Sequence, residues 1–184
     1  MNSLKNNSFK PETENRYIIR RLTGNDTDKA CAYLQALSPE SKTRFGPHAF
    51  DKETVMNLLN DTEQMRVYGA FEPESGTMIS YALIRKGYLH HDQARLESYG
   101  LHLSEQYDCT YAPSVADYWQ NKGIGGLVFR YILNDLPPHC NRIILWGGVQ
   151  AGNLLAVNFY LRRNFRICGN FEHNGNNYDM ILNL

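Results

Sequence analysis

The most constraining feature of the sequence is a glycine-rich turn, Gln120–Gly126, between a strand pattern and a helix pattern. Residues 108–115 before the turn have the composition of a strand. Apolar residues then recur at helical spacing through 124–134, and the segment RIILWGGV at 142–149 predicts a further strand. A strand, a helix and a strand in this order predict an α/β fold with a mixed sheet.

The remaining elements fit around this unit. Further strands are predicted at 17–22, 65–71, 78–88, 165–171 and 178–182, with weaker alternation at 94–103. Further helices are predicted from Asn25 or Asp26 to about 37, at 52–60 and at 153–163, and Ser38-Pro39 ends the first of them. We expect a mixed, mostly antiparallel sheet of six to seven strands, flanked by about four helices.

Composition fits one domain, at 16–184, after a mobile polar tail at 1–15. Lysine plus arginine and aspartate plus glutamate each number 19, so net charge favours neither a nucleic-acid nor a membrane partner. The polar start lacks a secretory h-region, and no apolar run is long enough to span a bilayer. The four cysteines match no zinc spacing. We therefore expect a cytoplasmic protein with free thiols.

The chemistry of the turn points to an anion. Glycines let main chain approach a ligand without a Cβ in the way, and the first free N–H groups of the next helix attract negative charge. Lys122 adds positive charge, so we predict a diphosphate site; the alternative is that the glycines only start the helix tightly. The Walker pattern GxxxxGK[ST] is absent. A dinucleotide fingerprint also fails, because Val128 occupies its last position and no acid ends the next strand.

A second pattern, N-x-x-A-x-x-F-Y-x-x-x-x-F, is formed by Asn153, Ala156, Phe159, Tyr160 and Phe165. The turn contributes Q-x-x-G-x-G at Gln120, Gly123 and Gly125. Together the two patterns resemble the GNAT acyltransferases. Asn164 stands where that family usually has glycine, and asparagine is the next-best residue for a left-handed turn. The resemblance is specific over 109–171 and looser over 17–88.

This resemblance implies a sheet that splays between its fourth and fifth strands, with the pantetheine arm of acetyl-coenzyme A lying in the gap. Backbone N–H near Val115 would hold the thioester carbonyl, and Asn153 would bind pantetheine, cap its helix, or do both. The implied cofactor-binding residues are Val115, Gln120, Asn121, Lys122, Gly123, Ile124, Gly125, Gly126, Asn153 and Tyr160.

Tyr160 matches the family's usual general acid for the departing thiolate. A free tyrosine has a pKa near ~10 and a thiol near ~8.5, so full proton transfer is uphill. We therefore expect Tyr160 to stabilise the thiolate chiefly by hydrogen bonding; the alternative is a core tyrosine packed beside Phe159.

The general base is not obvious. Many family members carry a glutamate in the fourth strand, where this sequence has Thr110, which cannot serve as a base. Glu97 and Asp108 are the preferred catalytic candidates, ahead of Glu105 and His102. A chain of water molecules is an equal alternative.

No metal is predicted at His90-His91-Asp92, because adjacent histidines on a strand end point to opposite faces. Arg44, Phe45 and His48 follow the first helix, where family members shape the acceptor pocket. They are candidates for binding a carboxylate or phosphate on the acceptor, unless this loop only packs on the core.

The sequence thus predicts an N-acetyltransferase that binds acetyl-coenzyme A and a small-molecule or peptide amine together, so that the amine attacks the thioester directly. We expect a monomer or a homodimer. One alternative is a coenzyme A-binding regulatory module with little turnover. Another is an acyltransferase that uses a longer acyl group or a hydroxyl acceptor.

Overall fold

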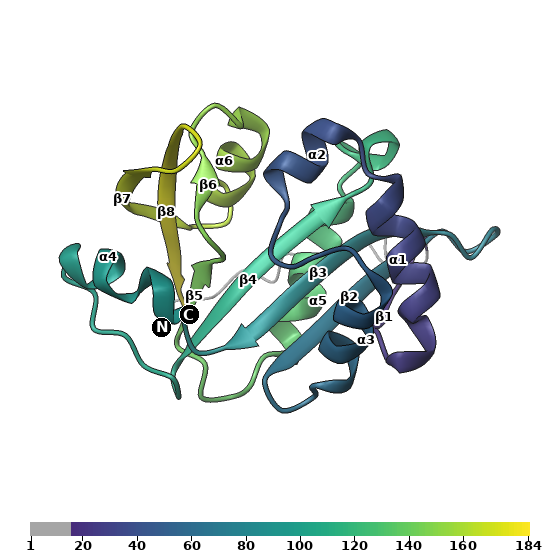
Figure 1. The fold of residues 1–184 in the computed structure, drawn as a ribbon, viewed down its shortest axis with the longest axis horizontal. Coiled ribbons are helices and arrows are strands. Elements are labelled where there is room, and N and C mark those ends of the chain that lie inside the picture. Colours follow the sequence, from purple (N-terminus) through teal and green to yellow (C-terminus); the bar gives the residue numbers. More distant parts are fainter. Residues whose placement is uncertain (1–15) are drawn as a thin grey trace, which may run out of the picture.

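The computed structural model describes residues 16–184, in which one mixed sheet carries helices on both faces (Figure 1). The strands are β1 (Ile18–Arg21), β2 (Met65–Phe71), β3 (Met78–Lys86), β4 (Asp108–Val115), β5 (Arg142–Leu145), β6 (Val149–Gln150), β7 (Arg166–Glu172) and β8 (Asn176–Asn183). The helices are α1 (Thr27–Ala36), α2 (Pro39–Arg44), α3 (Lys52–Asn60), α4 (Gln93–Ser98), α5 (Ile124–Asp135) and α6 (Leu154–Leu161). The predicted tail, 1–15, lies outside the described residues.

The sheet joins its strands in the order β1-β2-β3-β4-β5-β8-β6, and β7 pairs with β8. Every pair is antiparallel except β4 with β5. The predicted mixed, mostly antiparallel sheet is confirmed. It has eight strands, and residues 16–184 form six helices, so both counts exceed the prediction.

Strand β3 shows how the sheet is held between two layers. Tyr81 and Leu83 pack into a cluster with α1 and α3, whereas Ala82 and Ile84 pack into a cluster with α5. This alternation follows from the period of two along a strand, and it buries β3 on both faces. The centre of the sheet is therefore fixed, and the surface available for a ligand lies farther along, where β4 meets β5.

The prediction of a strand at 94–103 is wrong, because residues 93–98 form helix α4. Leu96 of α4 and Leu101, which follows the helix, are buried and pack with Ile144 and Ile181 of the sheet. Their spacing of five residues does not match a strand, and an ion pair from Arg95 to Asp179 of β8 holds the helix in place. The weak alternation of this segment came from exposed polar residues.

The predicted strand 142–149 is interrupted. β5 ends at Leu145, and Gly147 and Gly148 have φ angles of 62° and 72°, in the left-handed region that interrupts a strand. The chain resumes as β6, which pairs with β8. The interruption turns main chain away from β4, and this opens the sheet.

Helix α2 begins where the sequence predicted only the end of α1. The Ser38 hydroxyl accepts a hydrogen bond from Ser41 N, and Pro39 occupies the first turn, so Ser-Pro starts a second helix. Asp117 accepts hydrogen bonds from Ser38 N, Ser38 Oγ and Ser41 Oγ. These bonds, that from Ser41 above all, lower the pKa of Asp117 to about 2. Helix α2 is thereby fixed to the segment that precedes the glycine-rich turn.

Candidate active site

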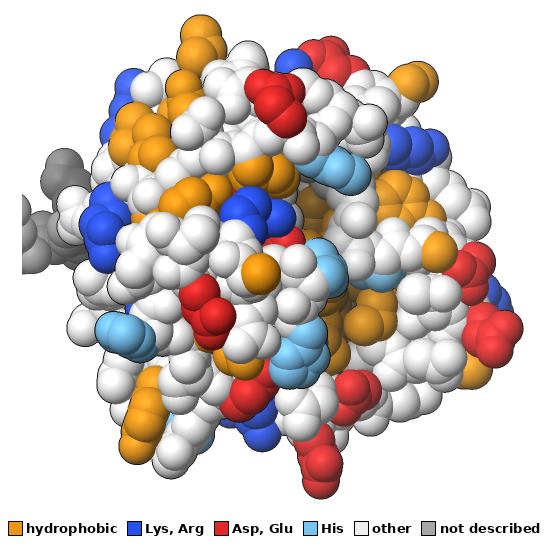
Figure 2. Space-filling view, turned by 60° about the vertical axis from the view of Figure 1, so that its left-hand side comes forward, with side chains coloured by type: hydrophobic (Ala, Val, Ile, Leu, Met, Phe, Trp, Pro, Cys, Tyr) orange, Lys and Arg blue, Asp and Glu red, His pale blue; other side chains and the backbone are white. Residues whose placement is uncertain are grey.

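A cavity of about 1620 Å³ lies where β4 and β5 separate, and Figure 2 shows a hollow ringed by charged, histidine and apolar side chains. We call one side the main-chain wall; its lining residues lie within 111–115, 120–126 and 153–163. We call the other the side-chain wall; its lining residues lie within 41–47, 91–95 and 171–174. Residues 145–150 join the two.

The separation of β4 from β5 begins at Tyr111. The two strands pair only from Asp108 to Tyr111, and Trp146 N donates the last bond, 2.9 Å long, to Tyr111 O. Strand β4 continues to Val115, so Pro113 and Val115, which share the edge of Tyr111 by alternation, face the gap. Proline lacks an N–H, and at 113 this missing donor leaves the pairing with β3 intact. The N–H of Val115 points into the cavity, which fits the predicted splay.

The glycine-rich turn presents main-chain amides to the same cavity. Asn121 and Gly123 have φ angles of 61° and 83°, and α5 begins directly after them. Gly126 N and Leu127 N both donate to Gly123 O, whereas within residues 16–184 no acceptor is found for the amides of Ile124 and Gly125. Free amides at a helix start, after left-handed residues, form a concave site for an anion.

Glycine is required in this turn for two different structural reasons. Gly123 is required by its left-handed conformation. Gly125 and Gly126 let α6 cross closely: a Cβ at Gly125 would lie 3.0 Å from Phe159 Cε2, and one at Gly126 would collide with the Arg163 guanidinium. The sequence predicts that these glycines let a ligand approach, but at 125 and 126 the close neighbours are Phe159 of α6 and Arg163 just after it.

Three other predicted cofactor residues fall in different places. Gln120 Nε2 donates to Val115 O at 3.2 Å, which ties the turn to the open edge of β4. Asn153 lines the cavity, and its Oδ1 accepts from Ala156 N at 3.2 Å, so it is the cap of α6. Lys122 lies outside the wall, with Nζ 3.7 Å from the centre of the Tyr118 ring.

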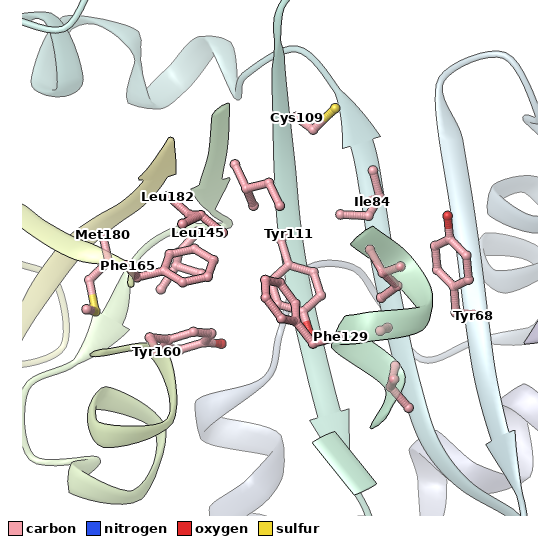
Figure 3. Packing of buried hydrophobic residues seen from close by; sticks show 14 of the residues in the cluster. Tyr68, Ile84, Cys109, Tyr111, Phe129, Leu145, Tyr160, Phe165, Met180 and Leu182 are labelled. Atoms are coloured by element: carbon pink, nitrogen blue, oxygen red, sulfur yellow. The ribbon is translucent and has the colours of Figure 1, made fainter. Parts of the chain in front are cut away.

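Tyr160 lies in the main-chain wall and is buried against an aromatic group, with its ring 5.3 Å from those of Phe159 and Phe165 (Figure 3). Burial raises the pKa of Tyr160 well above its usual range. The side chain is therefore a neutral phenol at ordinary pH, suited to donating a hydrogen bond rather than to releasing its proton.

Arg163, which the sequence argument missed, also lines the main-chain wall. Its guanidinium stacks 3.7 Å from the centre of the Phe159 ring, and Nη1 donates to Phe159 O. Burial, together with the nearby Arg130 and Arg162, lowers the pKa of Arg163. An anion at the turn would relieve this unfavourable environment. No motif marks Arg163, because only the crossing of α6 over Gly126 brings it there.

Neither predicted base lies in the cavity wall. Asp108, at the paired end of β4, is buried; it binds Arg142 through both oxygens and accepts from Ser104 N. Glu97 accepts from Gln93 Nε2 on the exposed side of α4. Thr110, also buried, donates to Gly87 O. The geometry gives no support to Glu97 or Asp108 as a base.

A different carboxylate does line the cavity. Asp92 is 4% exposed and lies 2.9 Å from Arg95, whose guanidinium also binds both oxygens of Asp179. Two buried carboxylates thus share one guanidinium, which also stacks on Phe171 at 3.7 Å. This part of the side-chain wall carries an excess of negative charge. The sequence singles out Asp92 only as a possible metal ligand, because Asp179, which shares Arg95 with it, lies on β8, far away in sequence.

His48, His90 and His91 have different partners and do not form one site. His48 is 3.1 Å from the Tyr81 hydroxyl and does not line the cavity, whereas Arg44 and Phe45 do. His90 faces Glu105 and His91 faces Asp92, each at 3.6 Å. Among the residues the structure describes, no group of three or more potential metal ligands is found. No helix in the described part of the chain is long and apolar enough to cross a membrane.

No protein-family model and no curated protein matches the sequence. The fold does match solved structures. One is a GNAT-family acetyltransferase from Streptococcus pneumoniae, with 18% identity, a TM-score of 0.66, and 91% of this chain and 99% of that chain covered. Another is the ribosomal-protein-S5-alanine acetyltransferase from Vibrio fischeri, with 11% identity, a TM-score of 0.69, and 91% and 93% covered.

A third is Arabidopsis thaliana NAA60 in complex with acetyl-CoA, with 14% identity, a TM-score of 0.67, and 91% and 98% of the two chains covered. At these identities the likeness is one of fold. It extends over about nine tenths of the chain. The chain therefore has the fold of the GNAT acetyltransferases.

Proposed function

We propose that the protein transfers an acetyl group from acetyl-coenzyme A to a primary amine. The observation that carries the proposal is that the free amides of Ile124 and Gly125 line the same cavity as the open edge of β4. A diphosphate and an amide-bearing arm are the chemical groups that these two features fit. Solved structures of this fold contain coenzyme A or acetyl-coenzyme A, which supports the choice of donor.

Residues of the main-chain wall would hold the donor. The amides of the turn and the guanidinium of Arg163 would bind the diphosphate, and the N–H of Val115 would bind the arm or its thioester carbonyl. In the reaction the amine nitrogen bonds to the thioester carbon, the C–S bond breaks, and its electron pair remains on sulfur. Tyr160, as a neutral phenol, would donate a hydrogen bond to that sulfur.

The side-chain wall would receive the amine. Asp92 has a carboxylate that Arg95 only partly neutralises, because Asp179 binds the same guanidinium. An ammonium group is the natural partner for this charge, so Asp92 would bind the amine, and water would accept the proton that the amine loses. Related folds act on a ribosomal protein and on aminoglycosides, so both peptide and small-molecule amines are consistent with the fold.

A regulatory coenzyme A-binding module is the second candidate. One observation favours it: within the described part of the chain, neither carboxylate expected to act as base reaches the cavity, and Thr110 is occupied with Gly87. Retention of Tyr160 in the wall favours the enzyme.

One experiment separates the two. Thermal denaturation is measured with and without acetyl-coenzyme A, and peptide and small-molecule amines are then screened by the release of free thiol. A raised melting temperature with thiol release for at least one amine supports the enzyme. A raised melting temperature with no release for any amine supports the regulatory module. No ligand effect at all would contradict both.

A further inference from the structure

Tyr111 has a hydroxyl group with no partner inside the protein. The residue is 1% exposed, and its oxygen makes no hydrogen bond in the described structure. A buried hydroxyl without a partner is unfavourable, and phenylalanine would fill the same space without that cost. The ring beside it, whose centre is 5.3 Å away, belongs to Phe129, which carries no hydroxyl group. We therefore expect this hydroxyl to form a hydrogen bond with a bound ligand.

Tyr111 also lies at the deep end of the gap between β4 and β5, where the arm of a bound ligand would end. It lines the cavity, and its carbonyl accepts the last hydrogen bond between β4 and β5 before the strands part. An arm that enters from the turn and follows the open edge of β4 must pass Val115 and Pro113 before it reaches Tyr111. Pro113 offers no N–H there, so the deep end of the gap lacks a main-chain donor from β4 at that position.

A second buried phenol, Tyr160, belongs to the same core cluster as Tyr111. Tyr111 and Tyr160 belong to one aromatic cluster, linked through the rings of Phe129 and Phe165, which are 5.8 Å apart. Figure 3 shows the Tyr160 hydroxyl on the side of its ring that faces Tyr111. Burial first, and then the electrostatic effect of Tyr160, raises the pKa of Tyr111. Both stay neutral, and each has one O–H to donate.

We propose that Tyr111 is a second hydroxyl donor to the sulfur of the bound thioester, completing with Tyr160 a two-hydroxyl site for the thiolate that leaves. The inference rests on the proposed function, since it takes coenzyme A as the ligand. When the C–S bond breaks and its electron pair remains on sulfur, the two O–H groups share the new charge. Each phenol keeps its proton, and no covalent bond to the protein forms.

The test compares coenzyme A with desulfo-coenzyme A, which lacks the sulfur, by calorimetric titration. Tyr111→Phe should weaken coenzyme A binding about tenfold at pH 9, where the thiolate is abundant, because a hydrogen bond to a charged group is lost. The loss should be smaller at pH 7, below the ordinary thiol pKa of about 8.5. Desulfo-coenzyme A should bind the variant as it binds the original protein.

Tyr17→Phe is the matched control. Tyr17 carries the other unpartnered buried hydroxyl among the described residues, and it does not line the cavity. Each substitution should raise the melting temperature of the ligand-free protein by about 2–4 °C, because each removes an unsatisfied hydroxyl. Only Tyr111→Phe should change the preference for coenzyme A over its desulfo analogue.

Three outcomes would overturn the inference. The first is an unchanged preference in Tyr111→Phe. The second is an equal loss of affinity for both ligands, which would indicate repacking. The third is an original protein that binds both ligands equally at pH 7 and pH 9; coenzyme A binding would then stand without a hydrogen bond to sulfur. An original protein that binds neither ligand would instead contradict the proposed function.

Discussion

The two walls of the cavity are built by different means. The main-chain wall presents backbone groups: the open edge of β4 and the free amides of the turn, with α6 packed across them. The side-chain wall presents charged and aromatic groups from α2, from the segment before α4 and from the β7–β8 hairpin. Backbone groups serve one ligand chemistry whatever the side chains are. The main-chain wall therefore suits a constant donor, and the side-chain wall suits a particular acceptor.

The largest effect should come from charge placed in the main-chain wall. Gly125→Glu places a carboxylate among the free amides, where the diphosphate of the ligand would bind. Because the two negative charges would compete for the same amides, we expect the affinity for acetyl-coenzyme A to fall more than about 100-fold. The melting temperature should then no longer respond to the ligand. Gly152→Glu is the control, because a Cβ there meets no atom within 4 Å.

Gly125→Ala separates the effect of charge from that of bulk. Its Cβ would lie 3.0 Å from Phe159 Cε2, so the ring must shift slightly, and most of the binding should remain. A ligand response retained in Gly125→Glu would show that the turn is not the diphosphate site.

This difference between the walls also explains what the sequence could predict. The patterns over 109–171 lie in one continuous stretch, and left-handed turns, caps and helical spacing are local properties. They located β4, α5, α6 and the cap at Asn153. Local patterns likewise gave the bounds of α3.

The side-chain wall could not be predicted in this way. Asp92, Arg95 and Asp179 lie together only because β8 is added beside β5. Helices α2 and α4 have six residues each, too few for a helical period to show. Glu97 and Asp108, the expected bases, lie in or near β4 in sequence, but Asp108 is buried in an ion pair with Arg142.

The next effect concerns the chemistry rather than binding. Tyr160→Phe should lower kcat about 10- to 100-fold and leave the affinity for acetyl-coenzyme A nearly unchanged, since the hydrogen bond strengthens only as charge develops on sulfur. Because burial raises the pKa of Tyr160, ionisation of this phenol should not reduce the wild-type rate up to about pH 10, its ordinary pKa. Tyr131→Phe, on α5 outside the wall, is the control. Full activity in Tyr160→Phe would show that Tyr160 contributes only to packing of the core.

A smaller effect tests whether a side chain assists the main-chain wall. Arg163→Gln removes the guanidinium above Gly126 and should weaken coenzyme A binding about tenfold, with a loss that shrinks at high salt. Arg166→Gln, an exposed change on β7 outside the wall, should have no effect. If the two variants bind coenzyme A equally well, the diphosphate is held by main chain alone, and the contrast between the walls becomes sharper.

The smallest effect should come from the side-chain wall, and it should appear only in the acceptor. Asp92→Asn keeps the shape of the side chain and leaves Arg95 bound to Asp179, so the fold should be retained. We expect the KM for the amine to rise about fivefold, because one uncompensated carboxylate is lost, while the affinity for acetyl-coenzyme A stays the same. Glu53→Gln, on α3 outside the cavity wall, is a charge-matched control.

A loss of donor affinity in Asp92→Asn would mean that the two walls do not divide the ligands between them. An unchanged KM would place the amine elsewhere in the cavity, and Arg44 and Glu172, which also line it, would be the next residues to vary.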